Sequence, residues 1–325
     1  MLWKPSPEGS PPVRLRMLPS AAAAVLALAL AGCGSAEIGG QPAGNSSEGQ
    51  KLKVVATTTQ VADFARNVGG DAITLTPLLR ANVDPHGYEP SPADVQAIAG
   101  ADVIVKNGVG LERFLDAAIE SAGFPGTVVD SSTGAAIRPG DEADPEGDPH
   151  LWHDPRNAKI MARNIADAFA AKDPAGGAGY QARYTAYAAK IDALDRDIAA
   201  KFAAIPAEKR KLVTNHDAFG YYVARYGLRF VGSVIPSFDT SAELSGKDIS
   251  SLVAKIKAAG ATAIFSESSL PAKAAETIGR EAGVRVVQGD GALYGDTLGP
   301  SGSGADTYLS MEEHNTDTIV TALSG

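Results

Sequence analysis

The sequence predicts an α/β protein whose body consists of two parallel-sheet lobes joined by one long helix. Short apolar, β-branched segments alternate with amphipathic helical segments over residues 51–172, and the same alternation returns over residues 206–325. Such alternation is typical of parallel sheets covered by helices. Between the two regions, residues 173–205 carry no strand signal. A helix of about thirty residues would be about 45 Å long, so we expect it to run along both lobes.

Residues 1–32 have the features of a lipoprotein signal peptide. Arg14 and Arg16 precede the apolar run AAAAVLALALAG, which is shorter than the roughly 20 residues of a membrane-spanning helix. The run ends at Cys33, the single cysteine, so the chain can form neither an internal disulfide nor a thiolate metal cluster. The string LAGC resembles a bacterial lipoprotein box, in which the cysteine is lipidated after cleavage. The alternative is an ordinary secretory signal that leaves a free cysteine.

Residues 33–50 are predicted to be a flexible tether. They are rich in Gly, Ser and Gln and offer almost nothing to bury. The net charge of −9 is spread over scattered residues, which argues against nucleic acid as a partner and provides no basic face for a lipid surface. We therefore expect a lipid on Cys33 to be the only membrane attachment.

In the first lobe, four strands and three helices are expected before the helical middle of the chain. Ser91 is predicted to cap the second of these helices, with Pro92 at its first position. The expected strands are residues 52–59, 73–79, 102–108 and 127–132, and the expected helices are residues 61–69, 91–101 and 114–123.

From Pro155 to about Ile205 the sequence predicts only helix. A first helix starts at Pro155, and a second covers most of residues 175–205. The second helix carries apolar residues at helical spacing, which we interpret as core packing. They are Tyr180, Tyr184, Tyr187, Ile191, Leu194 and Ile198.

The alternation resumes in the second lobe. A strand over residues 211–215 ends at His216, and a helix is expected from His216 to the closing Gly227. The remaining expected strands are residues 228–235, 261–267 and 284–290, and the remaining helices are residues 247–260, 271–283 and 305–323.

Four side chains in loops at or near strand ends are candidate metal ligands: His86, His150, His216 and Asp296. In open α/β sheets, ligands bind at the carboxyl ends of strands. Any one loop histidine is more often a surface residue, but three of the five histidines share these surroundings, two of them within Asp-Pro-His. Each predicted lobe supplies two of the four residues. The sequence therefore predicts a metal cleft between the lobes.

Other polar residues near these positions are weaker candidates. His153 lies three residues after His150 and is either a ligand, a support for the ligands or a solvent-facing residue. Glu267 ends a predicted strand and could orient a histidine by accepting a hydrogen bond from its ring. Trp152 is expected to pack in the core. His314 is expected on a solvated polar face of the last helix.

Several motifs together resemble one protein family, and they cover essentially all of residues 51–325. They are DPHGYEPSPADV, DPHLWHDPRN, VTNHDAFGYYVARYGL, IPSFDTSAELSGKDISSLVAKIKAAGATAIFSE and LYGDTLG, followed by DTYLSMEEHNTDTIV. The set is similar to the cluster A-I metal-binding lipoproteins of ABC transporters, the zinc and manganese solute-binding proteins. The resemblance implies two α/β lobes joined by a long rigid helix, with one transition-metal ion between them. Carried over by motif, its ligands are His86, His150, His216 and Asp296.

The ligand types favour zinc as the transported ion. Three imidazoles and one carboxylate suit tetrahedral Zn²⁺, whereas Mn²⁺ prefers more oxygen donors. The resemblance adds that some manganese-specific members have Glu where this chain has His216. Zinc-specific relatives often have a long histidine-rich loop, but residues 138–148 form a short acidic stretch without histidine. We interpret that stretch as a solvated surface loop or as a weak electrostatic funnel for cations.

The sequence thus predicts an extracytoplasmic solute-binding lipoprotein, anchored through Cys33, which captures Zn²⁺ and delivers it to an ABC permease and its ATPase. It is expected to be a monomer and not an enzyme. The alternatives are a manganese-specific binding protein, a surface adhesin and a secreted zinc hydrolase. A hydrolase needs an open metal position for water, but no H-E-x-x-H pair is present and Asp296 would close the site.

Overall fold

The computed structural model describes residues 51–140, 142 and 144–325. The predicted signal peptide, tether and lipidated Cys33 lie outside the described residues. Among the residues that are described, no helix combines the length and apolar character needed to cross a membrane. The two-lobed α/β fold expected from the sequence is confirmed.

The first lobe contains a parallel sheet of four strands in the order β2-β1-β3-β4. The strands are β1 (Leu52–Ala56), β2 (Ile73–Pro77), β3 (Val103–Lys106) and β4 (Thr127–Asp130). Val54 of β1 pairs in register with Leu75 of β2 and Val103 of β3. The order places β1 and β3 in the middle, where their apolar runs are buried.

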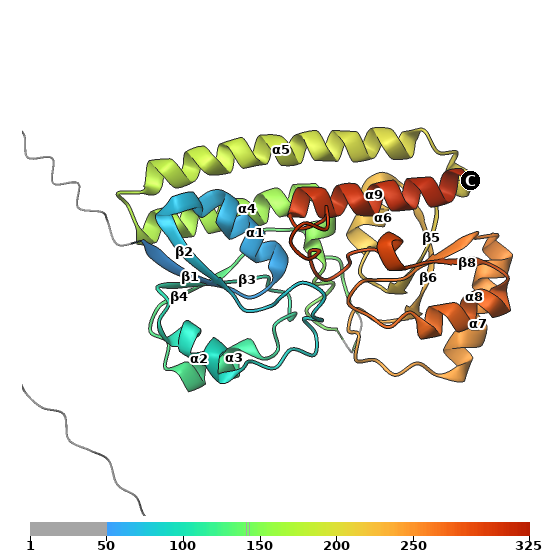
Figure 1. The fold of residues 1–325 in the computed structure, drawn as a ribbon, viewed down its shortest axis with the longest axis horizontal. Helices are drawn as coiled ribbons and strands as arrows, with labels where there is room; N and C mark the ends of the chain where they lie inside the picture. The colour runs from blue at the N-terminus through green and yellow to red at the C-terminus, as the bar shows by residue number, and fades with distance from the viewer. Residues whose placement is uncertain (1–50, 141, 143) are drawn as a thin grey trace, which may run out of the picture. The chain divides into compact units, whose positions relative to one another are not determined.

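Helices cover both faces of this sheet, as Figure 1 shows. Because successive strand residues point to opposite faces, Val54 packs in the core shared with α1 (Thr59–Gly69) and α4 (Pro155–Lys172). Its neighbour Val55 packs in a separate core under α2 and α3. These two helices are α2 (Pro92–Ala99) and α3 (Leu115–Ala122).

Local capping explains where the first helices begin. Ser91 forms a capping box with Asp94 and Pro92 occupies the first turn of α2, which confirms the sequence prediction. The first strand ends three residues earlier than expected, at Ala56. It ends there because the Thr58 side chain accepts a hydrogen bond from Val61 N (3.3 Å) and starts α1.

The second lobe is built from two parallel strand pairs, β5–β6 and β7–β8, with β5 beside β7. The strands are β5 (Lys211–His216), β6 (Arg229–Ile235), β7 (Ala263–Phe265) and β8 (Arg285–Val287). Val213 and Ile264 face the core shared with α7 (Gly246–Ala259) and α8 (Lys273–Ala282), while Leu212 and Phe265 join the large core. The last helix is α9 (Tyr308–Ser324).

The helix after β5 begins later than the sequence predicted. It is α6 (Gly220–Tyr226), four residues beyond His216. His216 N donates to Glu267 Oε1 (3.0 Å) and Asp217 N donates to Ser237 O (3.2 Å), so both amides have partners outside a helix. Gly220 has no side chain, and the Arg138 guanidinium fills the space where a Cβ would lie.

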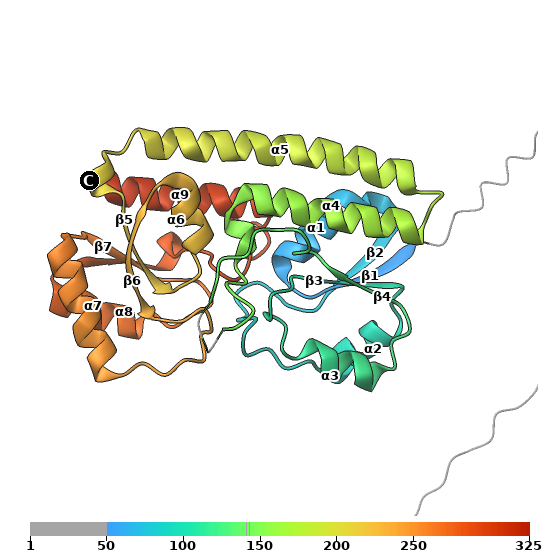
Figure 2. The ribbon, with the colours of Figure 1, turned by 180° about the vertical axis from the view of Figure 1, so that it is seen from behind.

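Helix α5 (Gly177–Ala203) connects the lobes and lies along both of them (Figures 1 and 2). Its 27 residues correspond to about 40 Å. It packs on α1 and α4 in the first lobe and on α6 and α9 in the second. The predicted core positions are confirmed, except that Tyr184 is only partly buried.

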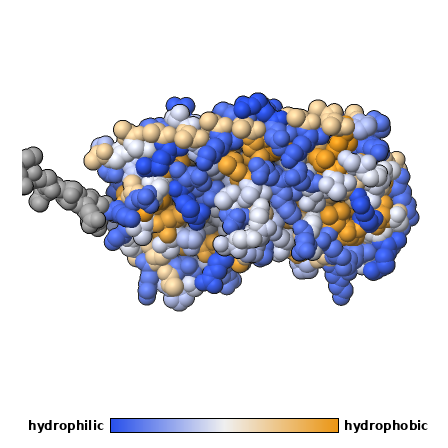
Figure 3. Space-filling model, turned by 45° about the horizontal axis from the view of Figure 1, so that its top comes forward, coloured by the Kyte–Doolittle hydropathy of each residue, from blue (hydrophilic) through white to orange (hydrophobic). Residues whose placement is uncertain are grey.

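The body keeps its large apolar side chains inside. On the face seen in Figure 3, hydrophilic residues are interspersed with smaller groups of hydrophobic ones. In the part of the chain that the structure describes, the exposed large hydrophobic residues are Val128 and Ile137, at 39% and 37% exposure.

Truncating α5 at its buried face should weaken the whole body. Ile191 is fully buried in the large core. We expect Ile191→Ala to lower the free energy of unfolding by about 2–5 kcal/mol, because the loss of apolar burial is joined by a cavity. Urea unfolding measures this. Lys190→Ala, at an exposed neighbouring position, should change the free energy by less than about 0.5 kcal/mol; equal effects would contradict the packing role of α5.

Candidate metal centre

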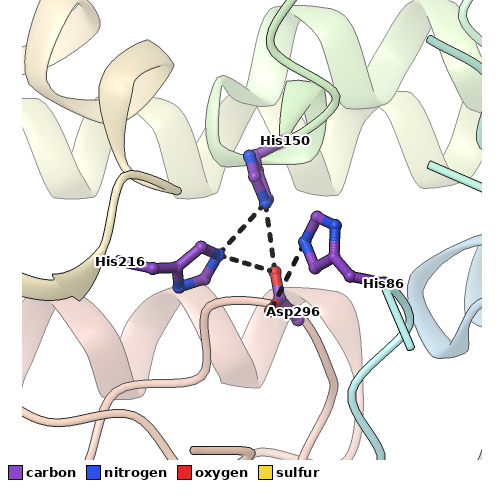
Figure 4. A group of neighbouring side chains, drawn as sticks. All are labelled: His86, His150, His216 and Asp296. Atoms are coloured by element: carbon purple, nitrogen blue, oxygen red, sulfur yellow. Dashed lines mark hydrogen bonds and ion pairs between the residues drawn. The ribbon is translucent and has the colours of Figure 1, made fainter. Parts of the chain in front are cut away.

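Four side chains converge where the two lobes meet, as Figure 4 shows. His86 lies in the loop between β2 and α2, and His150 precedes the short 3₁₀ turn Leu151–His153. His216 ends β5, and Asp296 lies in the loop between β8 and α9. One ligand atom from each residue lies within 4.8 Å of the others. The structure thus brings together all four residues that the sequence selected.

The four groups point at a common centre. His150 Nε2 and His216 Nε2 are 3.2 Å apart and lie 3.2 and 3.3 Å from Asp296 Oδ1. His86 Nε2 is 3.9 Å from Asp296 Oδ2. The side chains of His150, His216 and Asp296 are fully buried, and that of His86 is 5% exposed. Three ring nitrogens and a carboxylate at this spacing can surround one small cation.

Hydrogen bonding among the described residues leaves donor atoms of this cluster free for a cation. His86 Nε2 and both carboxylate oxygens of Asp296 are buried without a hydrogen-bond partner there. At 3.2 and 3.3 Å, His150 and His216 approach Asp296 without the geometry of a hydrogen bond, and His86 at 3.9 Å is too distant for one. A buried polar atom without a partner costs free energy, and coordination of a metal ion would remove that cost.

Carboxylates set the orientation of two of the rings. Asp148 Oδ1 accepts a hydrogen bond from His150 N (3.0 Å) and lies 2.8 Å from Nδ1 of the same ring. Glu267 Oε1 makes the same pair of contacts with His216, at 3.0 Å to the backbone nitrogen and 3.0 Å to Nδ1. With Nδ1 facing a carboxylate, each ring turns Nε2 toward the common centre.

His86 is held differently, through its backbone and across the lobe boundary. Asp84 Oδ1 accepts from His86 N (2.9 Å), and Asp84 Oδ2 accepts from Thr240 Oγ1 (2.6 Å), which belongs to the second lobe. A further link joins Asn82 N to Thr297 Oγ1 (3.1 Å), one residue after Asp296. The loop that carries His86 is therefore tied to the opposite lobe at two points.

Sequence reasoning missed Asp148, although its signal was present. Both Asp-Pro-His strings place an aspartate two residues before the histidine, and in both the aspartate accepts a hydrogen bond from the histidine backbone. Asp148 also pairs with the Arg138 guanidinium, and its backbone oxygen accepts from the Tyr221 hydroxyl (2.8 Å). The same spacing in both Asp-Pro-His strings could have indicated that Asp148 supports His150.

His153 lies outside the group of four. Its Nδ1 is 2.8 Å from Glu312 Oε1 on α9, and its Nε2 is 3.0 Å from Gly295 O. Trp152, expected to pack in the core, is fully buried there and donates its indole N–H to Gly295 O (3.1 Å).

The expected solvated face around His314 is wrong. Glu312 and Asn315 are fully buried, and His314 is partly buried with Nε2 2.9 Å from Ala292 O. Asn315 accepts from Tyr294 N (2.8 Å) and donates to Tyr294 O (2.9 Å). His314 and Asn315 thus hold the loop that carries Asp296, through Ala292 and Tyr294, while Glu312 contacts His153.

Burial and mutual charge displace the pKa values in the cluster. Burial alone would raise the pKa of Asp296, but His216, His150 and His86 outweigh it and hold that pKa well below its usual range. Burial alone would lower the pKa of His150, but Asp148 and Asp296 raise it to about 9. The pKa of His216 is likewise raised well above its ordinary value, by Asp296 and Glu267 against burial. Because the pKa values of His150 and His216 are raised, a metal ion that binds their Nε2 atoms competes with protons there.

A cavity of about 380 Å³ adjoins His86. Acidic residues of both lobes line it, among them Asp144, Glu146 and Asp239. Arg113 Nη1 lies 2.9 Å from Asp239 Oδ2 across the lobe boundary. Part of the acidic stretch 138–148 thus borders the approach to His86.

Comparisons with known proteins find metal-uptake and metal-binding proteins. The family described as zinc-uptake complex component A, periplasmic (ZnuA) matches residues 54–322. Over 300 residues the chain is 34% identical to the manganese-binding lipoprotein MntA of Halalkalibacterium halodurans, covering 92% of this chain and 96% of that one. It is 31% identical over 288 residues to the manganese ABC transporter substrate-binding lipoprotein PsaA of Streptococcus pneumoniae, covering 86% and 92%.

Solved structures share the fold. The periplasmic zinc binding protein TroA from Treponema pallidum matches with a TM-score of 0.79 and 32% identity, covering 84% of this chain and 99% of that one. A Mn-bound periplasmic metal binding protein from Candidatus Liberibacter asiaticus matches with a TM-score of 0.75 and 26% identity, covering 84% and 100%.

The raised pKa of His150 makes the metal-free protein sensitive to alkali. Its pKa is about 9 in the folded chain against an ordinary 6.5, so its contribution is complete below about pH 6.5 and is lost as pH rises toward 9. We expect the free energy of unfolding in the presence of a chelator to fall by on the order of 3 kcal/mol over that range. Urea unfolding at pH 6 and pH 9 measures it.

A matched control tests whether His150, rather than another histidine, causes the decline in stability. His314→Gln should keep the decline, whereas His150→Gln should reduce it. A metal-free protein of equal stability at both pH values would contradict the proton-holding arrangement.

Proposed function

The chain belongs to the zinc-uptake complex component A family, whose members are substrate-binding proteins rather than enzymes, and on that premise we propose that it captures Zn²⁺ for a metal ABC importer. The ligands that we propose are His86, His150, His216 and Asp296. The observation that carries the proposal is the convergence of three imidazole nitrogens and one carboxylate within 4.8 Å.

The chemistry of this donor set supports zinc. Zn²⁺ binds imidazole nitrogen and carboxylate oxygen tetrahedrally, at about 2.0–2.2 Å. Four protein donors complete that geometry and leave no coordination position for a reactive water, as suits a protein that carries its ion unchanged. The buried setting of His150, His216 and Asp296 favours an ion that sheds its water on binding.

Manganese is the second candidate. Two of the relatives described above are named for manganese, and both oxygens of Asp296 are free of hydrogen-bond partners among the described residues, so that bidentate coordination could add an oxygen donor. A site of nitrogen and oxygen donors nevertheless binds Zn²⁺ more tightly than Mn²⁺ in the general affinity order of divalent metals. The test must therefore compare the two ions in direct competition.

Capture and release follow from the division of ligands between the lobes. Each lobe contributes two donors, so a bound ion holds the lobes together at the boundary, while α5 packs on both lobes and limits their separation. Delivery then requires the permease to move at least one donor away from the others. His86 is the suitable donor, because it is the one exposed in part and adjoins the cavity.

We also propose that the protein acts outside the cytoplasm. The named relatives are lipoproteins, and Cys33 follows the sequence features of a lipoprotein signal. We propose that the mature chain begins at a lipidated Cys33, acts as a monomer, and has the permease and its ATPase as partners.

Competition dialysis tests the cargo. We expect the protein, stripped with chelator and dialysed against equimolar zinc and manganese, to retain one equivalent of zinc by mass spectrometry. His150→Ala should lose that equivalent, and Lys190→Ala, at an exposed position of α5, should keep it. One equivalent of manganese would transfer the proposal to manganese, and a metal-free wild-type protein would overturn the proposed function.

Zinc affinity should fall as pH is lowered. Only an unprotonated imidazole nitrogen binds the ion, so protons compete more strongly at lower pH. We expect at least a tenfold weaker affinity at pH 5.5 than at pH 7.5, measured by competition with a chelator of known pH dependence. An affinity that is unchanged between the two values would exclude a site with three histidine ligands.

A further inference from the structure

A fully buried pair of ionisable residues joins the two lobes beside the candidate metal centre. His153 follows His150 by three residues, and its Nδ1 lies 2.8 Å from Glu312 Oε1 on α9. Both side chains have no solvent exposure. The pair thus connects the turn that follows a first-lobe ligand with the last helix of the second lobe.

The same histidine reaches the loop that carries the second-lobe carboxylate. His153 Nε2 lies 3.0 Å from Gly295 O, and Trp152 donates its indole N–H to the same oxygen (3.1 Å). Gly295 immediately precedes Asp296. On its other side, Gly295 is so close to the Glu267 carboxylate that a Cβ would overlap it. The backbone before Asp296 is therefore held between the two lobes.

The stability of the fold is not a sufficient reason for a histidine and a glutamate at these buried positions. His153 stacks on Phe219 at 4.4 Å between ring centroids and lies near Tyr222, so its surroundings are largely aromatic. Within the described part of the chain, Glu312 Oε2 has no hydrogen-bond partner. Replacing a buried ionisable pair by apolar residues of similar volume is often neutral or stabilising. The contacts of His153 suggest a role in placing the loop.

We propose that His153, oriented by Glu312, is a positioning residue that sets the place of Asp296 relative to His150. The inference rests on the proposed metal-binding function of the four-residue cluster. Glu312 fixes the ring through Nδ1, which leaves Nε2 facing Gly295 O and 3.2 Å from the Trp152 indole nitrogen. Nε2 donates to Gly295 O when the ring carries protons on both nitrogens, in which form it pairs with the Glu312 carboxylate. The carboxylate of one lobe and the imidazole of the other are thus held at metal-binding spacing before the ion arrives.

Two double variants separate positioning from packing. His153→Leu with Glu312→Met replaces the pair by apolar side chains and removes the contact with Gly295. His153→Gln with Glu312→Met also removes the buried carboxylate, but the glutamine amide stands near the former Nε2 and can donate to Gly295 O. Single variants of His153 leave Glu312 without its partner in the core and are expected to destabilise the fold.

The readout is the zinc dissociation constant of the full mature chain, beside its thermal unfolding temperature without metal. We expect the Leu/Met variant to bind zinc about tenfold more weakly, as for other residues that support metal ligands, with an unfolding temperature at or above that of wild type. The Gln/Met variant should recover most of the lost affinity. Tyr222→Phe removes a different buried hydrogen bond, to Thr316 (2.7 Å), and should leave the affinity unchanged.

The outcomes distinguish this inference from the proposed function. A wild-type protein that binds no zinc would overturn the function itself. Zinc binding by the Leu/Met variant with wild-type affinity would overturn the positioning role of His153 and leave the function standing. Equal weakening of both double variants, without rescue by glutamine, would also overturn it and assign the effect to core packing.

Discussion

The structure depends on one electrostatic constraint, which is that the Asp296 carboxylate is buried among three imidazole rings contributed by both lobes. An isolated charge at such a depth would be costly, and the cluster offsets that cost through His150 and His216, whose pKa values are raised, or through a cation. The direction of the pKa values of Asp296, His150 and His216 reflects this balance. A metal ion of charge two would satisfy the same carboxylate without protons, which makes capture a replacement of protons by metal.

The remaining architecture holds these groups in place. Asp148 and Glu267 orient one ring in each lobe, whereas His86 depends on Asp84 and its contact with Thr240. The rings of His150 and His216 are therefore oriented by carboxylates of their own lobes. The supports of the first-lobe ligands also reach the second lobe, through Thr240 for Asp84 and through Tyr221 for Asp148. The placement of His86 beside the cavity is consistent with entry and exit of the ion on that side.

The candidate site could be found in sequence because three of its members follow local rules. His216 ends a β-branched strand, and His86 and His150 both occupy Asp-Pro-His strings. The supporting contacts could not be found in that way. Glu312 meets His153 across 159 positions of the chain, and Thr240 meets Asp84 across 156. No sequence pattern marks either pairing, because the two partners meet only when the lobes are packed together. The same reason led to the wrong expectation that α9 is solvated around His314.

The sequence by itself determined the types of most elements and the chemistry of the donor set. Apolar periodicity and caps such as Ser91 act over a few residues, so they specify helices and strands without knowledge of the rest of the fold. The tertiary structure decided which polar groups are buried and which ones meet. Burial of Glu312, the late start of α6 at Gly220 and the convergence of Asp296 with His86 all depend on side chains distant in sequence. The physical reason is that the two lobes and α5 pack around a shared boundary. A polar group buried there needs a hydrogen-bond or charge partner, and the local sequence does not show which distant residue supplies it.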